Sequence, residues 1–288
     1  MDLSVIIPSF NTCNLLNDCL SSIFNSNINY NFEVIVVDNN SKDQSIEMIK
    51  RNFPQVVLLE NKENFGFSKA NNQGVKIAKG EYILFLNSDT RVQKDAITKI
   101  MEFGKRNPNS VIGLKLLNPD FSPQKSCGPF FSLPVIFAML FLKGDKLGIT
   151  RYSPDKVKEV GWVSGACFLL QREIFKKVGG FDENIFMYFE EVELQYRIKK
   201  AGGKILFFPD AKLIHVGGAS NQEEARPVMN IYKGLSYLYQ KHEVKWKQTV
   251  VKIMLVKKAI LAILIGNIVR DKKILTTYRK AYEIISSY

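Results

Sequence analysis

A single aspartate, Asp89, ends the apolar run "ILFLNSD". A carboxylate at the end of a buried strand either caps the following helix or meets a ligand. The small polar residues Asn87 and Ser88 precede it, and the three together suit the edge of a site for a metal-bound diphosphate. One or two carboxylates suffice in such a site, because phosphate oxygens and water complete the coordination of a hard divalent cation. Both interpretations of Asp89 stay open at this point.

A second group of carboxylates lies in "YFEEVELQYR", where Glu190, Glu191 and Glu193 begin a predicted amphipathic helix. Acidic residues in a first turn interact favourably with the helix dipole, which alone would explain each of them. Adjacent glutamates after the aromatic residues of "FMYF" also suit a sheltered site, where burial raises the pKa of a carboxyl group toward that of a useful general base. His215, between a short apolar strand and two glycines, is either structural or a metal ligand beside Asp89.

Asp38 ends another apolar run, in "VIVVDNNSKD". Its carboxylate suits a hydrogen bond from a ribose hydroxyl or a base N–H, and the alternative is a local Asx turn. The segment "PSFNTCN" after the first strand lacks the glycine pattern of a dinucleotide-binding fold. It also lacks the Gly-rich basic loop of a nucleotidyltransferase, which disfavours that class of enzyme.

The elements that must position these residues alternate through the first half of the chain. Apolar runs such as "LSVIIPSF", "FEVIVVD", "QVVLLEN" and "EYILFLNSD" are separated by segments of about ten residues with helical spacing. This alternation predicts an α/β fold with a mostly parallel sheet flanked by helices. Ligands of such sheets bind beyond the carboxyl ends of the strands, so we expect the polar strand ends to line one crevice.

The second half of the chain is less regular. Residues 122–160 show no clear pattern apart from the apolar run "LPVIFAMLFL", which suits a buried helix, a membrane-dipping helix or a mobile lid. Ten residues are too few to span a bilayer. Regular patterns return with a strand, the helix that carries the glutamates and two short strands before His215. From Ile231 onward the chain predicts helices.

The positive charge is concentrated at the C-terminal end. Of the net charge of +12, residues 233–288 contribute +9, because ten lysines and two arginines there face three acidic residues. The same stretch is rich in Leu, Ile and Val, which favours an anionic membrane surface over nucleic acid. A nucleic-acid binder usually carries its charge on a folded reading surface, so we expect no nucleic-acid partner. The helices of this stretch are either a cap packed on the core or an interfacial anchor.

The cysteines are scattered, and neither they nor the two histidines form a zinc-binding spacing. We interpret Cys13, Cys19, Cys127 and Cys167 as reduced structural thiols of a cytosolic protein. The N-terminus leads directly into an apolar strand, without the basic and apolar regions of a signal peptide. We therefore expect a cytoplasmic protein that is peripheral on the inner face of the cell membrane.

Six segments resemble, in order and spacing, glycosyltransferase family 2, the inverting transferases of GT-A fold, and within it the rhamnosyltransferase-like branch. They are "SVIIPSFN", "VIVVDNNSKDQS", "ENFGFSKANNQG", "ILFLNSDT", the stretch from "SGACF" to "RIKKAG", and "HVGGAS". Each segment alone is weak evidence, whereas six in order are specific. The resemblance implies a GT-A domain over residues 1–220 and leaves residues 221–288 as a basic, apolar helical extension that associates with membranes.

The resemblance also implies a role for each candidate residue. Asn87 and Asp89 occupy the family's DxD position, where Asn replaces the first Asp, so binding of Mg²⁺ or Mn²⁺ rests on Asp89 together with His215. The general base falls in the family's Glu-Asp pair, here Glu190 and Glu191, and we assign it to Glu191 with Glu190 as the supporting carboxylate. The implied nucleotide-binding residues are Pro8, Ser9, Asn11, Asp38, Asn40, Asn64, Gly66, Phe67, Asn71, Asn87 and Ser88, with Ser41 nearby.

These roles predict an inverting hexosyltransferase of cell-surface polysaccharide synthesis. It would move a sugar, with rhamnose suggested by the branch, from a nucleoside-diphosphate donor to a hydroxyl of a saccharide or lipid-linked acceptor. Glu191 would take the proton of that hydroxyl during a single in-line displacement, with metal assistance at the diphosphate. The acceptor would bind in the irregular stretch 122–160. The alternative is a catalytically degenerate module that binds nucleotide sugars or glycans.

Overall fold

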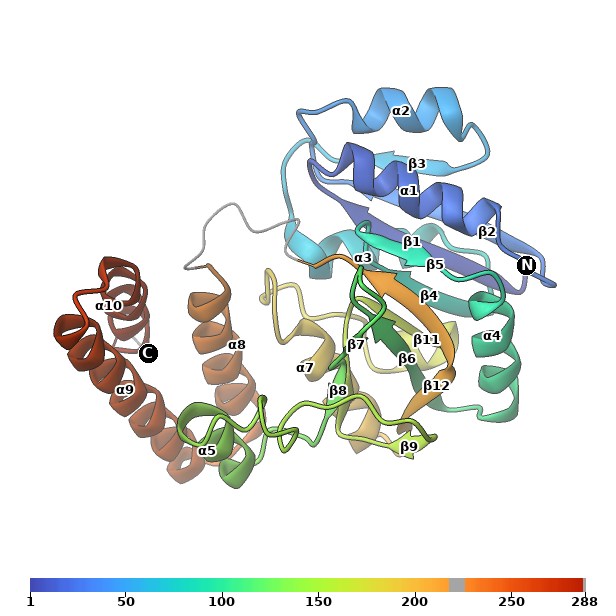
Figure 1. Ribbon diagram of the computed structural model, residues 1–288. Helices are drawn as coiled ribbons and strands as arrows, with labels where there is room; N and C mark the ends of the chain where they lie inside the picture. Colours follow the sequence, from blue (N-terminus) through green and yellow to red (C-terminus); the bar gives the residue numbers. More distant parts are fainter. Residues whose placement is uncertain (218–225, 287–288) are drawn as a thin grey trace.

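The computed structural model describes residues 1–217 and 226–286 and shows a central sheet with helices on both faces (Figure 1). The strands are β1 (Leu3–Ser9), β2 (Phe32–Asp38), β3 (Val57–Glu60), β4 (Tyr82–Leu86), β5 (Thr90–Val92), β6 (Ser110–Leu117), β7 (Pro123–Gln124), β8 (Cys127–Gly128), β9 (Lys158–Glu159), β10 (Trp162–Val163), β11 (Cys167–Gln171) and β12 (Lys204–His215). The helices are α1 (Cys13–Phe24), α2 (Ser45–Asn52), α3 (Gly66–Ile77), α4 (Ala96–Arg106), α5 (Leu133–Phe141), α6 (Arg172–Lys177), α7 (Glu190–Lys200), α8 (Arg226–His242), α9 (Lys245–Ile268) and α10 (Lys272–Ser286).

The main sheet has the order β3-β2-β1-β4-β11-β6-β12-β5. Strands β3, β2, β1 and β4 are parallel, as the alternating pattern predicts, and β6 and β12 point the same way. Strand β11 runs antiparallel between β4 and β6, and the edge strand β5 runs antiparallel to β12. The carboxyl ends of β1, β2, β4 and β12 therefore lie along one edge of the sheet.

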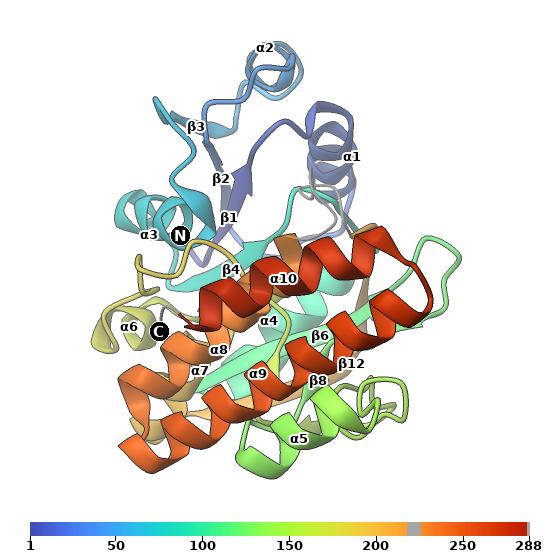
Figure 2. The ribbon, with the colours of Figure 1, turned by 90° about the vertical axis from the view of Figure 1, so that its left-hand side faces the viewer.

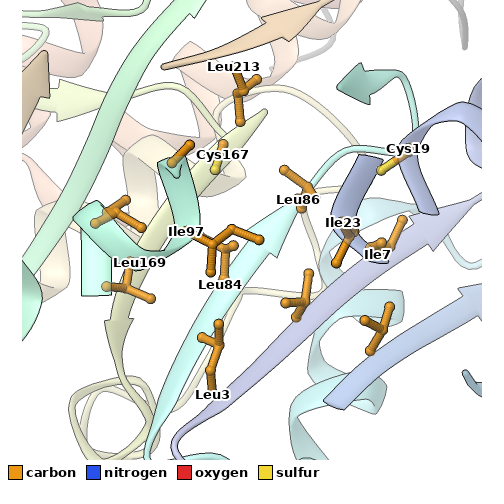
Figure 3. Close-up of a cluster of buried hydrophobic side chains, with 14 of the residues drawn as sticks. Leu3, Ile7, Cys19, Ile23, Leu84, Leu86, Ile97, Cys167, Leu169 and Leu213 are labelled. Carbon is orange, nitrogen blue, oxygen red and sulfur yellow. The ribbon is translucent and has the colours of Figure 1, made fainter. Parts of the chain in front are cut away.

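The alternation of side chains along β1 divides the core between the two faces of the sheet. Leu3, Val5 and Ile7 face a cluster that includes residues of α1, α2 and α4. Figure 3 shows part of this cluster, with Cys19 and Ile23 of α1 packed against the strands. Ile6 points the other way, into a cluster with residues of α3, α6 and α7. The two clusters hold the strand ends, and the polar residues on them, in fixed positions.

A third apolar cluster joins the C-terminal helices to the rest of the chain. It contains residues of α5, α8, α9 and α10 together with Phe131, Trp162, Phe189 and Val192. The hydroxyl of Tyr239 on α8 donates a hydrogen bond to the carbonyl of Phe131 at 2.7 Å. The apolar run in the irregular stretch is thus a helix, α5, which packs against α9. The predicted boundary between residues 1–220 and 221–288 lies among residues outside the described part and stays a prediction.

The four cysteines, all within the described part, are free thiols. Burial raises the pKa of Cys19 and of Cys127 to about 12 each, so both are uncharged at neutral pH and chemically inert. Over residues 1–217 and 226–286, none of the helices has the combination of length and apolarity that crossing a bilayer requires.

Candidate active site

The ends of β1 and β4 are linked by a chain of hydroxyl groups. Ser9 Oγ lies 3.1 Å from Thr12 Oγ1, and Thr12 Oγ1 donates to Ser88 Oγ at 3.0 Å. All three residues are buried. Buried hydroxyls are retained where each one finds a partner, so this chain fixes the strand ends against each other. Thr12 was not among the residues predicted from the sequence.

A cavity of about 710 Å³ opens beyond these strand ends. Its size is typical of ligand sites, which measure roughly 300–1,000 Å³. Most of the residues predicted from the sequence line it. They are Pro8, Ser9, Asn64, Gly66, Phe67, Asn87, Ser88, Asp89, Glu190, Glu191 and His215. The structure therefore gathers the candidate metal ligands and the candidate base around one space.

Asp38 does not line this cavity, because its side chain is fully buried and serves the adjacent loop. Its two carboxylate oxygens accept hydrogen bonds from the backbone N–H of Ser41 at 2.8 Å and from Ser41 Oγ at 2.6 Å. The same hydroxyl accepts a hydrogen bond from the backbone N–H of Asn11 at 2.9 Å. This arrangement is the Asx-turn alternative of the sequence. The role of Asp38 toward a nucleotide stays a prediction.

Asn11, Asn40 and Asn71 also lie off the cavity lining. Asn11 and Asn40 have φ angles of 53° and 66°, in the left-handed region that asparagine tolerates better than most residues. Asn71 is fully buried, and its amide donates to the carbonyl of Phe67 at 2.9 Å. These three residues shape the backbone next to the site, and their predicted contacts with a nucleotide remain untested.

Gly66 connects the α3 side of the cavity to the segment before α7. Its φ is +80°, and a β-carbon placed there would lie 2.6 Å from the ring of Phe186. Only glycine fits both constraints. The next residue, Phe67, donates its backbone N–H to the carbonyl of Phe186 at 3.0 Å. The "NFG" segment is thereby held against the chain that leads to the glutamates.

Asp89 and His215 face each other at the cavity wall. His215 Nε2 lies 3.4 Å from Asp89 Oδ1. The other ring nitrogen, Nδ1, lies 2.7 Å from Oε1 of Gln124, whose amide nitrogen donates to Asn118 Oδ1 at 3.0 Å. Gln124 thus presents its oxygen to the ring and accepts the Nδ1 proton. A neutral His215 then turns the lone pair of Nε2 toward the carboxylate.

A metal ion placed between these two acceptors would be bound by both of them. A carboxylate and an imidazole whose second nitrogen is already hydrogen-bonded are suitable metal ligands. Within residues 1–217 and 226–286, no group of three or more His, Cys, Asp or Glu side chains could hold a metal ion. By their donor chemistry, Asp89 and His215 fit a divalent cation that takes its remaining ligands from a diphosphate and water.

The two glutamates are delivered by an unusual start of helix α7. Tyr188 and Phe189 have φ angles of 68° and 72°, which is strained for aromatic residues and turns the chain sharply before Glu190. Glu190 is 5% exposed, and one carboxylate oxygen of Glu190 and one of Glu191 lack a hydrogen-bond partner among the described residues. Strained backbone and unsatisfied buried acceptors both concentrate at functional sites.

Burial raises the pKa of Glu190 well above its usual range, and the neighbouring charge of Glu191 adds to this effect. Burial also raises the pKa of Glu191, although backbone N–H groups, including that of Gly165, and the positive charge of Arg151 act in the opposite direction. A carboxyl group with a raised pKa is a stronger base once it has lost its proton. Glu191 is thus suited to accept a proton from a bound hydroxyl.

The rest of the cavity lining comes from segments whose place in the site the sequence did not predict. Residues of the irregular stretch line the cavity through Phe131, Met139 and Arg151, and Trp162 of β10 joins them. The guanidinium of Arg151 lies 5.5 Å from the ring centre of Trp162. Helix α8 adds Met229, Asn230, Ile231 and Lys233. Trp162 begins the short strand β10 and the others lie in helices or irregular segments, so their place in the site could not be predicted from local patterns.

Residues 4–179 match the family described as Glycosyl transferase family 2, which is more than half of the chain. The chain belongs to this family. It is 28% identical over 250 residues to the O-antigen biosynthesis protein RfbC of Myxococcus xanthus, covering 81% of this chain and 18% of that protein. It is 27% identical over 236 residues to the N-acetylglucosaminyl-diphospho-decaprenol L-rhamnosyltransferase of Mycobacterium tuberculosis, covering 74% of this chain and 76% of that protein. The chain spans only 18% and 25% of the length of two of its curated relatives.

Two solved structures show the same fold. One is the mannosyltransferase PcManGT from Pyrobaculum calidifontis in complex with GDP-Man and Mn²⁺, with a TM-score of 0.60, 17% identity and coverage of 99% of this chain and 85% of that one. The other is GalNAc-T7 with UDP, GalNAc and Mn²⁺, with a TM-score of 0.66, 18% identity and coverage of 100% and 56%. These comparisons confirm the predicted family with its rhamnosyltransferase-like branch, the GT-A fold and the glycosyltransferase class.

Proposed function

We propose that this family 2 glycosyltransferase transfers a sugar with inversion from a nucleoside-diphosphate donor, and that Glu191 is the general base. The observation that carries the proposal is the meeting, in one cavity, of the Asp89–His215 pair with the buried Glu190 and the half-buried Glu191, whose pKa values desolvation raises. One base and one stabiliser of the leaving group are sufficient for a single displacement.

The donor side of the proposed site consists of the strand ends. Asn64, Gly66 and Phe67 contact the nucleotide and sugar of the donor, and the diphosphate lies against Ser88 and Asp89. Asp89 and His215 would hold a divalent cation, Mg²⁺ or Mn²⁺, which when bound neutralises the charge of the departing diphosphate. Both structural neighbours were solved with Mn²⁺, which supports a metal-dependent donor site.

The acceptor side lies next to Glu191. Its carboxylate accepts the proton of the acceptor hydroxyl as the oxygen forms a bond to the anomeric carbon. The bond from that carbon to the diphosphate oxygen breaks on the opposite face, so the configuration inverts. Glu190 stays beside Glu191 as a second carboxylate. The charge of Glu191 raises the pKa of Glu190, which disfavours ionisation of both groups together.

The acceptor in this proposal is a saccharide or a lipid-linked saccharide of cell-surface polysaccharide, and rhamnose is the first sugar to test. One relative is named for rhamnosyl transfer to a diphospho-decaprenol-linked sugar, and another for O-antigen biosynthesis. A lipid-linked acceptor would require the enzyme to work at a membrane, on the anionic, cytoplasmic face. The basic C-terminal helices support that location.

The test is the thermal stability of the protein with a panel of nucleoside diphosphates, with and without Mg²⁺ or Mn²⁺. We expect one base to raise the melting temperature only when metal is present, and Asp89→Asn to remove the increase. Asp95→Asn, which changes an exposed aspartate at the start of α4, is the matched control and should keep it. No metal-dependent increase with any diphosphate would contradict the proposed donor site.

Transfer itself separates the enzyme from a degenerate binding module. Nucleotide-dependent stabilisation together with release of the diphosphate and glycosylation of an acceptor supports the enzyme. Stabilisation without any turnover, across dTDP-, UDP- and GDP-sugars and lipid-linked acceptors, would support the binding module instead.

A further inference from the structure

Helix α9 presents an apolar surface on two opposite sides. Its buried side, formed by Val251, Leu255, Ala259, Ala262 and Gly266, packs into the third apolar cluster and against α10. On the opposite side Ile253, Ile260, Leu264 and Ile268 are between 44% and 81% exposed. Their spacing of seven, four and four residues places them along one line of the helix. An apolar line on the side of a helix that faces away from the core is available to contact lipid or another protein.

Exposed apolar side chains also occur on the neighbouring helix and in the loop after it. Helix α5 packs beside α9, and the two, together with α10, form the outer layer that faces the viewer in Figure 2. Phe137 on α5 is 46% exposed, Leu142 directly after the helix is 52% exposed, and Leu147 and Ile149 in the following loop are 67% and 52% exposed. Exposed apolar side chains on neighbouring helices mark an interaction surface.

From these observations we infer that the α5–α9 face docks on an anionic lipid bilayer, with the apolar residues inserted at the interface and the surrounding lysines against lipid phosphates. Lys257 lies among the exposed residues of α9, and Lys143 and Lys146 lie beside those of α5. The lysines of α9 interrupt any spanning run, so the helix lies in the plane of the membrane. A basic apolar surface of this kind binds anionic membranes through both contributions.

Charge selects the bilayer over a second copy of this chain. The exposed Lys143, Lys146 and Lys257 outnumber the exposed Asp145 on this face. A two-fold symmetric dimer through this face would bring the same cationic surface against itself, and like charges across an interface are unfavourable. An anionic bilayer has the complementary charge and an apolar interior for the exposed side chains.

The proposed docking face and the cavity share helix α5. Met139 of α5 lines the cavity, whereas Phe137 on the same helix is exposed in the docking face. A lipid-linked acceptor could therefore keep its lipid in the bilayer while its sugar reaches Glu191. The lipid-linked acceptor rests on the proposed function, but docking itself does not.

The experiment is flotation of the full chain with vesicles of phosphatidylcholine, alone or mixed with phosphatidylglycerol. We expect binding to the mixed vesicles and little binding to phosphatidylcholine. Substituting Ile260→Glu together with Leu264→Glu should weaken binding by at least about tenfold, because two aliphatic side chains that insert into the bilayer are lost. Lys257→Gln should weaken it by about fivefold, the usual worth of one lysine at an anionic surface. Ile77→Glu, at an exposed apolar position on α3, is the matched control and should bind as the unaltered chain does.

Equal vesicle binding by the double variant and the unaltered chain would overturn the inference. So would absence of binding to mixed vesicles, or a dimer in solution that the double substitution dissociates.

The metal-dependent stabilisation by a nucleoside diphosphate is measured on the same samples. If it persists in the double variant while vesicle binding is lost, the variant is folded and docking is supported. If a nucleoside diphosphate stabilises the unaltered chain but the chain does not bind vesicles, only the docking inference fails. If the chain binds vesicles but no nucleoside diphosphate stabilises it, only the proposed donor site is contradicted.

Discussion

Helix α7 and the loop before it carry two pairs of carboxylates in opposite surroundings, each with one buried and one half-buried member. Glu190 and Glu191 line the cavity, and each leaves one oxygen without a hydrogen bond among the described residues. Glu193, one turn along, is fully buried but accepts hydrogen bonds from Arg197, Lys241 and His242 at 2.6 to 2.9 Å. Asp182 in the loop before α7 makes a similar contact, 2.5 Å from the ammonium of Lys241.

The two pairs show that partners, rather than burial, decide the direction of a pKa shift. Burial alone would raise the pKa of every one of these carboxyl groups. For Glu193 and Asp182, hydrogen bonds from Arg197 and Lys241 outweigh burial and lower the pKa. At Glu190 and Glu191 burial outweighs the backbone N–H groups and the charge of Arg151, and the pKa of both is raised. Carboxyl groups with a raised pKa, such as Glu190 and Glu191, are the kind that enzymes use as general bases.

The comparison also assigns a structural role to the C-terminal extension. Lys241 and His242 belong to α8, and both contact Glu193 of α7. Tyr237 of α8 donates a hydrogen bond to Asp182 at 2.8 Å. Helix α8 therefore holds both ends of the segment that delivers Glu190 and Glu191 to the cavity.

The largest effect is expected when the proposed base loses its charge. Glu191→Gln keeps the shape of the side chain, so the turnover of donor and acceptor should fall by more than about 10²-fold, the usual worth of a general base. Glu193→Gln is the matched change on the same helix. The folded fraction of this variant should keep more transfer activity than Glu191→Gln keeps. Single-turnover transfer rates measure both. Near-normal turnover by Glu191→Gln would remove Glu191 from the mechanism.

The two pairs should respond with opposite signs when stability is measured at neutral pH. Glu193→Gln leaves the cations around it without their partner, so the free energy of unfolding should fall by about 3 kcal/mol, the low end for breaking a buried pair. Glu190→Gln replaces a buried carboxyl group that gains little from ionisation, so stability should be unchanged or higher. Urea denaturation of the two variants tests this difference. A comparable loss in both would mean that Glu190 has a cationic partner.

Much of the candidate site could be predicted from the sequence because strand-end residues keep their place in any parallel sheet. Asp89, Ser9 and the NFG segment follow from the positions of their strands. Asp38 shows the limit of this reasoning, because a strand-end aspartate can equally hold its own loop, as the hydrogen bonds from Ser41 show. Arg151 could not have been found from local patterns, since it reaches the cavity through packing across the irregular stretch.

The same limit applies to the fold. The antiparallel direction of β11 depends on the long connection that precedes it, which has no regular pattern in the sequence. The composition of the C-terminal helices was clear, but the alternatives of a cap and an anchor were both compatible with it. The structure shows that α8 packs on the core through Tyr239, whereas Ile268 of α9 remains exposed.

The smallest effect, and the sharpest test of the comparison, is the dependence of these stability differences on pH. The pKa of Glu193 is lowered by folding, so its contribution is present above the unfolded value of about 4.3 and is lost as pH falls through the folded pKa. The pKa of Glu190 is raised, so its ionisation opposes folding increasingly as pH rises from about 4.3 through the folded pKa. The deficit of Glu193→Gln relative to the unaltered chain should therefore shrink in acid. Any gain in stability of Glu190→Gln over the unaltered chain should instead grow as the pH rises. Urea midpoints of the three proteins across this range measure both trends, and parallel curves would show that the two carboxyl groups share one electrostatic environment.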